Sequence, residues 1–117
     1  MPVRTKSIYE AASPDDGLRV LTTQYWPRGV KREKVDRYVR SLGPSRELLH
    51  KFKRSQIDWG GYVVRYLEEV ESESAQKEIE ALVELARAQI VTVMCVCKDD
   101  VQCHRRLLKR LIEDRLK

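Results

Sequence analysis

The distribution of apolar residues along the chain predicts three short strands. β-branched residues with partial alternation predict strands near 3–9 and 18–23. The segment 90–97, Ile-Val-Thr-Val-Met-Cys-Val-Cys, is apolar without alternation, which is typical of a strand that is covered on both faces. Strands of this kind lie centrally in parallel sheets and are flanked by helices. We therefore expect 90–97 to be the central strand of a short, mainly parallel sheet.

Capping residues and apolar spacings of three and four predict the helices that flank this sheet. Such helices are expected after an N-cap at Asp58, around Ile79–Ala86, and over 100–116 with Asp100 as N-cap. Two short basic helices, separated by Gly43-Pro44, are expected over 32–42 and 45–54. Early strands, central helices and a final strand–helix unit predict a small α/β domain. One such domain accounts for the whole of 1–117.

Composition excludes several classes of protein. No apolar run approaches the roughly 18 residues of a membrane span, and the first residues lack the apolar stretch of a signal peptide. Three cysteines without an export signal indicate a reducing compartment, so we expect a cytoplasmic protein with no membrane partner. The absence of asparagine, with abundant Lys, Arg and Glu, is compatible with a thermophilic source.

Charge is unevenly distributed along the chain, whose net charge is +5. Residues 1–57 carry 13 basic and 6 acidic side chains, whereas residues 58–89 carry 3 and 8. The basic segment 28–54 is therefore a candidate for binding nucleic acid, with Trp26 or Tyr38 available to stack on a base. The alternative is a solvated surface that forms salt bridges with the acidic stretch Glu68–Glu84.

The segment from Cys95 to Arg106 carries the residues best suited to chemistry. If Asp100 caps the last helix, Cys103 lies in the first turn, where free N–H groups favour anions and can lower a thiol pKa. We take Cys103 and His104 as candidate catalytic residues. Lys98 and Arg105 are candidate ligands of an anion. The alternatives are that Cys95 only packs in its strand and that His104 is buried against one backbone partner.

A zinc site is a further alternative at the same place. Cys95, Cys97, Cys103 and His104 are suitable ligand types, but the spacing C-x-C-x5-C-H matches none of the usual zinc pairs. We therefore expect neither a metal nor an organic cofactor here.

The motif Trp26-Pro27-Arg28-Gly29 forms a second cluster. If 18–23 and 90–97 are parallel neighbours, this turn lies at the same carboxyl edge of the sheet as Cys103, where open α/β sheets bind ligands. Trp26, Arg28 and Gly29 are then candidate ligand-binding residues, with the Arg28 guanidinium as a planar fork for phosphate. The alternative is a surface arginine stacked on Trp26.

Several short motifs follow one another along nearly the whole chain: Lys6…Tyr9, Gly17-Leu18-Arg19-Val20-Leu21, Trp26-Pro27-Arg28-Gly29, Pro44-Ser45-x-Glu47-Leu48 and Cys95…Lys98-Asp99…Cys103-His104-Arg105. Their order resembles the domain-of-unknown-function 488 (DUF488) family, and most closely its YeaO-like branch. That branch usually has Asp-Arg where this chain has Thr23-Gln24. The resemblance implies a shared fold and the same site location, and it implies no named reaction.

Together these observations predict a domain that binds, or acts on, a small anionic, phosphate-bearing molecule at the carboxyl edge of its sheet. Whether the protein is an enzyme stays open, because no phosphate loop or Ser–His–Asp order names a reaction. A nucleic-acid-binding module that uses 28–54 is the alternative. A zinc site at the cysteine and histidine cluster is the second alternative.

Overall fold

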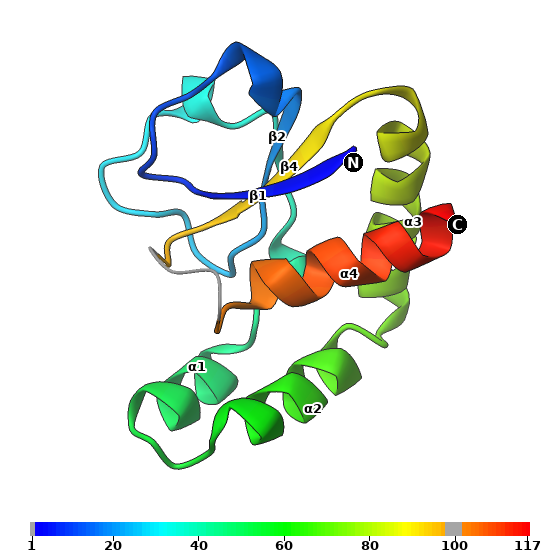
Figure 1. The fold of residues 1–117 in the computed structure, drawn as a ribbon. Coiled ribbons are helices and arrows are strands. Elements are labelled where there is room, and N and C mark those ends of the chain that lie inside the picture. The colour runs from blue at the N-terminus through cyan, green and yellow to red at the C-terminus, as the bar shows by residue number, and fades with distance from the viewer. Residues whose placement is uncertain (1, 98–101) are drawn as a thin grey trace.

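The structure is a computed structural model that describes residues 2–97 and 102–117. Its centre is a four-stranded sheet in the order β1-β4-β2-β3, and each pair of neighbouring strands is parallel (Figure 1). The strands are β1 (Val3–Ser7), β2 (Leu18–Leu21), β3 (Arg37–Tyr38) and β4 (Val91–Cys95). The predicted α/β fold with a short parallel sheet is confirmed.

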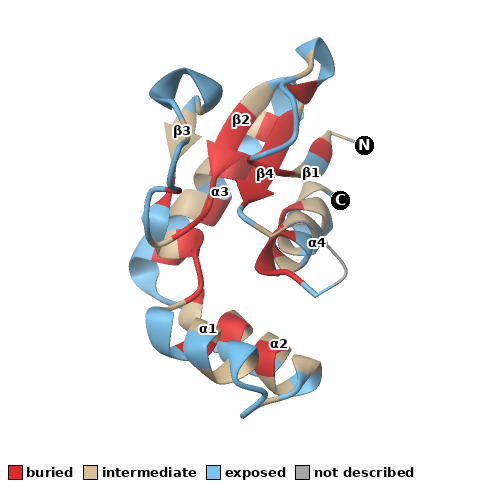
Figure 2. Cartoon of the chain, turned by 90° about the vertical axis from the view of Figure 1, so that its left-hand side faces the viewer, coloured by how far each residue is buried: buried red, intermediate tan, exposed pale blue. Residues whose placement is uncertain are grey.

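The strand β4 lies in the interior of the sheet, as its unbroken apolar sequence predicts. It pairs with β1 from Val3↔Val91 to Ser7↔Cys95 and with β2 on its other side. All five of its residues are buried, and Figure 2 shows the buried residues concentrated along β4 and β2. A strand without a solvated face has no position that favours a polar side chain, which is why alternation is absent.

We expect the backbone amides of β4 to be the slowest in the protein to exchange with deuterium. They are hydrogen-bonded on both sides and buried, so their exchange requires the global unfolding reaction. Native-state exchange followed by NMR or mass spectrometry measures this directly. Exchange of 91–95 as fast as that of the chain ends would contradict the assignment of β4 as the central strand.

The helices cover one face of the sheet and extend beyond it. They are α1 (Arg46–Lys53), α2 (Trp59–Glu69), α3 (Glu73–Ala88) and α4 (His104–Leu116). In Figure 1, α4 runs below the strands, and α1 and α2 lie side by side further below. Val91 and Val93 of β4 belong to the same core cluster as residues of α2, α3 and α4. No helix within 2–97 and 102–117 is long and apolar enough to cross a membrane.

The predicted helix over 32–42 is wrong. The segment forms a 3-10 turn at Arg32–Lys34, the strand β3, and a second 3-10 turn at Arg40–Leu42. Between the two turns its backbone bonds to β2: Asp36 N–H donates to the Arg19 carbonyl and Val39 N–H to the Leu21 carbonyl, both at 2.9 Å. The second face of the sheet is therefore covered by this irregular segment, whose apolar side chains pack on Ile8, Leu21 and Met94.

Two predicted helix starts have different outcomes. Asp58 caps α2, since its carboxylate accepts a hydrogen bond from Gly61 N–H at 2.8 Å. The last helix does not begin at 100, because α4 starts at His104 with Cys103 as its N-cap residue. Asp100 itself lies outside the described residues. Cys103 therefore precedes the first turn of α4 rather than lying within it.

Candidate functional site

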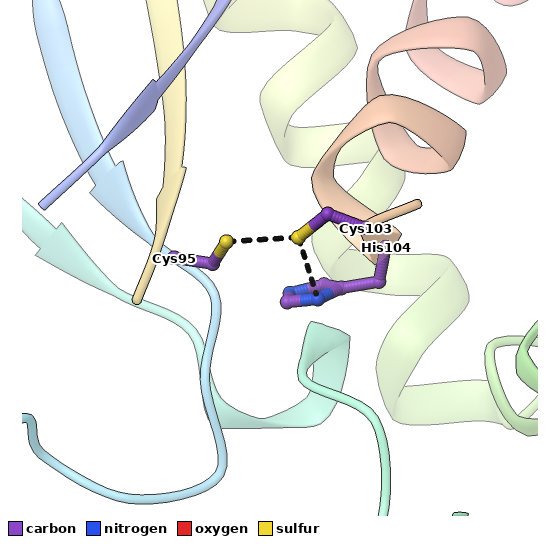
Figure 3. Close-up of side chains that lie close together, drawn as sticks. All are labelled: Cys95, Cys103 and His104. Atoms are coloured by element: carbon purple, nitrogen blue, oxygen red, sulfur yellow. Dashed lines mark hydrogen bonds between the residues drawn. The ribbon is translucent and has the colours of Figure 1, made fainter. Parts of the chain in front are cut away.

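The carboxyl edge of the sheet brings three buried side chains together. Cys95 is the last residue of β4, Cys103 caps α4, and His104 is the first residue of that helix. Figure 3 shows the three side chains pointing toward one another. The two sulfurs are 2.9 Å apart, and Cys103 Sγ lies 3.7 Å from His104 Nδ1. We call these three residues the Cys–His cluster.

His104 is held through one ring nitrogen. Its Nε2 lies 2.6 Å from the Thr22 carbonyl oxygen, which accepts only hydrogen bonds, so Nε2 carries the proton and donates it. Burial lowers the pKa of His104 to about 4, although the Thr22 bond opposes this change. The imidazole is therefore neutral near pH 7, and Nδ1 presents a lone pair toward Cys103. A buried histidine with one backbone partner is the alternative that the sequence predicts, and the hydrogen bond from Nε2 to the Thr22 carbonyl agrees with it.

The sequence predicts a Cys103 thiol with a lowered pKa, whereas the pKa values of both buried thiols, Cys95 and Cys103, are raised. The sulfurs of Cys95 and Cys97, together with burial, raise the pKa of the Cys103 thiol instead of lowering it. For Cys95, the hydrogen bond with Cys103 lowers the thiol pKa. The contact with Cys97 and burial outweigh this bond and raise the pKa of Cys95 to about 11. A free thiolate nucleophile at Cys103 is therefore disfavoured in this arrangement.

Arg105 places a buried positive charge beside the Cys–His cluster. The residue is only 3% exposed, and its Nη1 donates to the Cys97 carbonyl at 2.9 Å and to Cys95 Sγ at 3.5 Å. Among the described residues, its Nε has no hydrogen-bond partner. Within 2–97 and 102–117, no carboxylate lies within salt-bridge distance of Arg105. Because a guanidinium keeps its charge, Arg105 is a fixed positive charge at this edge of the sheet.

The second predicted cluster lies in the loop that follows β2. Trp26 donates from Nε1 to the Val30 carbonyl at 2.8 Å and packs edge-on against the Tyr38 ring. Arg28 and Gly29 are exposed, and the Tyr9 hydroxyl donates to the Arg28 carbonyl at 3.3 Å. In the described part of the chain, no hydrogen bond or ion pair joins the Arg28 side chain to the Cys–His cluster.

Since β2 and β4 are parallel neighbours, this loop does leave the sheet at the edge where β4 ends. Lys98, the remaining predicted ligand residue, lies outside the described residues. Gln24, which stands in this loop at one of the positions where the sequence departs from the YeaO-like pattern, donates from Nε2 to the Gly43 carbonyl at 2.9 Å. The loop is thereby joined to the turn that precedes α1.

Sequence reasoning did not select Thr22, and it named Cys95 only as a ligand of the alternative zinc site. The Thr22 hydroxyl donates to the Met94 carbonyl at 3.0 Å and lies 3.2 Å from His104 Nε2. Nothing local marks Thr22, because its partners are distant in sequence. The sequence does indicate Cys95, because it stands near the end of the predicted central strand, and ligands bind at the carboxyl ends of such strands.

The basic segment 28–54 is spread over a loop, β3 and α1. Part of its charge is paired: Arg37 bonds to Glu78 at 3.1 Å, as expected for the acidic stretch, and Lys51 bonds to Glu47 at 3.1 Å. Arg46 and Arg54 at the two ends of α1 are exposed. Nucleic-acid binding by this segment stays a prediction.

Comparison with known proteins identifies relatives along nearly the full chain. A family model described as "Active DUF488-N3 subclade" matches residues 3–116. The Escherichia coli (strain K12) protein named "Uncharacterized protein YeaO" is 29% identical over 110 residues, which cover 92% of this chain and 94% of the relative. The Mycobacterium bovis protein named "Uncharacterized protein Mb3100c" is 28% identical over 115 residues, 97% of this chain and 95% of the relative.

"Uncharacterized protein Rv3073c" of Mycobacterium tuberculosis (strain ATCC 25618 / H37Rv) is similar to the same extent, at 28% identity over 115 residues. No solved structure matches the chain.

Proposed function

Because the chain belongs to the DUF488-N3 family, in the subclade described as active, and because its sheet edge carries a buried positive charge, we propose that it binds a small anionic, phosphate-bearing molecule. The binding site is the corner between the end of β4, the loop after β2 and the start of α4. The Cys–His cluster lies next to this corner and supplies the groups that could act on the ligand.

The observation that carries the proposal is the burial of Arg105 without a described acidic partner. Burying a charge costs several kcal/mol unless a partner compensates for it, so a buried guanidinium whose Nε has no partner among the described residues is suited to an anionic ligand. The planar guanidinium also matches two oxygens of a phosphate or carboxylate at once. A phosphate-bearing ligand would thus complete the hydrogen bonding of this side chain.

The start of α4 adds to the attraction for an anion. α4 has 13 residues, and its N-cap residue Cys103 makes no side-chain capping hydrogen bond. The first N–H groups of a helix and its dipole both favour negative charge. Arg105 lies in this first turn. The charge of its side chain and the helix dipole therefore both attract an anion at the start of α4.

We expect inorganic phosphate to bind the full chain saturably, and we expect Arg105→Gln to weaken this binding by at least roughly tenfold, the size of one charge-assisted hydrogen bond. Arg28→Ala is expected to weaken it by a similar factor while changing the free energy of unfolding by less than about 0.5 kcal/mol. Titration calorimetry with the metal-free protein measures both affinities.

Arg87→Ala is the matched control, because Arg87 is exposed in the last turn of α3, which leads to the amino end of β4. It should bind phosphate as the unchanged protein does. A thermal melt of Arg105→Gln separates lost affinity from lost folding. Phosphate binding that is absent in the unchanged protein, or equal in Arg105→Gln and Arg87→Ala, would disprove the proposal.

A further inference from the structure

We propose that Cys95, Cys103 and His104 are three ligands of one zinc ion at the carboxyl edge of the sheet. This inference goes beyond anion binding and does not depend on it. It uses the Cys–His cluster, whereas the proposed anion site uses Arg105 and the first turn of α4.

The three ligand atoms already converge. One from each residue can be chosen so that all lie within 4.8 Å of one another, and all three residues are buried. In a tetrahedral zinc site with Zn–S of roughly 2.3 Å and Zn–N of roughly 2.0 Å, two sulfurs lie about 3.8 Å apart and a sulfur and a nitrogen about 3.5 Å apart. The observed separation of Cys103 Sγ and His104 Nδ1, 3.7 Å, is close to this value.

The two sulfurs are closer than a zinc site requires, at 2.9 Å. The difference of about 1 Å is within reach of a small side-chain rotation, because each sulfur is one bond from its Cβ. Repulsion between two thiolates favours the wider spacing once both protons are displaced by a metal. The ligands come from a strand end and a helix start, which hold the backbone in place.

His104 is held in the tautomer that a metal ligand needs. Because Nε2 donates to the Thr22 carbonyl at 2.6 Å, Nδ1 carries the free lone pair. A backbone acceptor on the second ring nitrogen is the usual second-shell partner of a metal-binding histidine, since it fixes the ring and raises its basicity. The same lone pair faces Cys103 Sγ, so a metal between them meets both ligands.

Cys95 has the surroundings of a ligating sulfur as well. Cys97 N–H donates to Cys95 Sγ at 3.4 Å, and Arg105 Nη1 donates to it at 3.5 Å. N–H donors stabilise a thiolate and tune its bond to the metal. Two thiolates balance the charge of Zn²⁺, and the charge of Arg105 then leaves the corner positive.

A tetrahedral set of two sulfurs and one nitrogen selects zinc over magnesium or calcium, which prefer oxygen ligands. Within the described residues, three ligands leave one tetrahedral position for water or another group. This is the ligand number of catalytic zinc sites rather than of closed structural ones.

The test is a titration of the reduced, metal-free chain with Co²⁺, followed by Zn²⁺. We expect one Co²⁺ per chain, a tetrahedral visible spectrum, a sulfur-to-cobalt charge-transfer band with the intensity of two thiolates, and loss of both signals when Zn²⁺ displaces Co²⁺. Cys103→Ser should lower the affinity at least 100-fold, because even second-shell changes cost roughly 10–100-fold. Serine is a favourable N-cap, so this variant is expected to fold.

Cys95→Ala and His104→Gln should lose the metal as Cys103→Ser does, and circular dichroism reports whether each is folded. The matched control is His50→Ala, which lies outside the cluster and should bind within about threefold of the unchanged protein, as expected for a residue that is not a ligand.

The proposal is overturned if the unchanged protein gives no charge-transfer band, if folded Cys103→Ser binds Co²⁺ normally, or if His50→Ala loses as much affinity as Cys103→Ser. Because phosphate binding is measured without metal, the failure of either proposal is distinguishable from the failure of the other.

Discussion

Gly17→Ala is expected to lower the free energy of unfolding by about 4 kcal/mol, combining backbone strain and overpacking. Gly17 has φ 62° and ψ −132°, a conformation that is almost confined to glycine. A Cβ at this position would lie 2.2 Å from the Ile90 carbonyl oxygen, so the backbone that precedes β4 would have to move. The same oxygen accepts the Leu18 N–H at 2.8 Å, which holds the two segments at this spacing.

Gly29→Ala is the matched control for this substitution. Gly29 also has a positive φ, 78°, but no atom of the described residues lies within 4 Å of a Cβ built there. Its substitution should cost only the backbone strain, about 1–2 kcal/mol. Urea denaturation of both variants measures the difference, and equal costs would contradict the role assigned to the contact with Ile90.

Asp16→Asn is the second large effect, with an expected loss of roughly 3 kcal/mol of stability. The Asp16 carboxylate is buried and accepts hydrogen bonds from Lys6 Nζ at 3.0 Å, Ser13 N–H at 3.0 Å and Arg19 Nη1. Asparagine keeps one acceptor oxygen but turns an NH₂ toward these donors and removes the charge that offsets two cations. Asp15→Asn, one residue earlier on the exposed side, should change stability by less than about 0.5 kcal/mol.

Asp16 also predicts how stability depends on pH. Burial disfavours the charged carboxylate, but the Ser13 N–H, Lys6 and Arg19 outweigh it and hold the pKa of Asp16 below its ordinary 3.8. A group whose pKa is lowered by folding stabilises the protein above its unfolded pKa. This contribution is therefore complete above about pH 5 and is lost as the pH falls below 3.8.

In Asp16→Asn this part of the acid dependence should be missing. Urea denaturation at a series of pH values from neutral to acid would show a smaller fall in stability for the variant than for the unchanged protein. An equal fall in both would mean that Asp16 is not a source of the acid sensitivity.

Much of the fold was predictable because the sequence patterns that indicate it lie within a single strand or a single helix start. The unbroken apolar run at 90–97 predicts a buried central strand, and β4 is that strand. Asp58 predicts the start of α2, since a carboxylate three residues before a free N–H is sufficient for a cap. The motif order predicts the family, which matches residues 3–116.

The predicted helix over 32–42 failed because helical propensity competes with pairing partners that local sequence does not reveal. Arg19 and Leu21 offer open backbone groups on the edge of β2, and the segment pairs with them as β3. The basic residues there had suggested a solvated helix, whereas the apolar residues between them cover the second face of the sheet.

By itself, the sequence determined that the chain is a small α/β domain with a central parallel strand and with cysteine, histidine and arginine residues close together near its end. Only the tertiary structure decided what these residues contact. Thr22 and His104 are 82 positions apart, and their hydrogen bond sets which imidazole nitrogen faces Cys103. The sheet order brings Cys95 to the start of α4 and buries Arg105. These contacts depend on packing between distant elements, and packing is not encoded in the spacing of neighbouring residues.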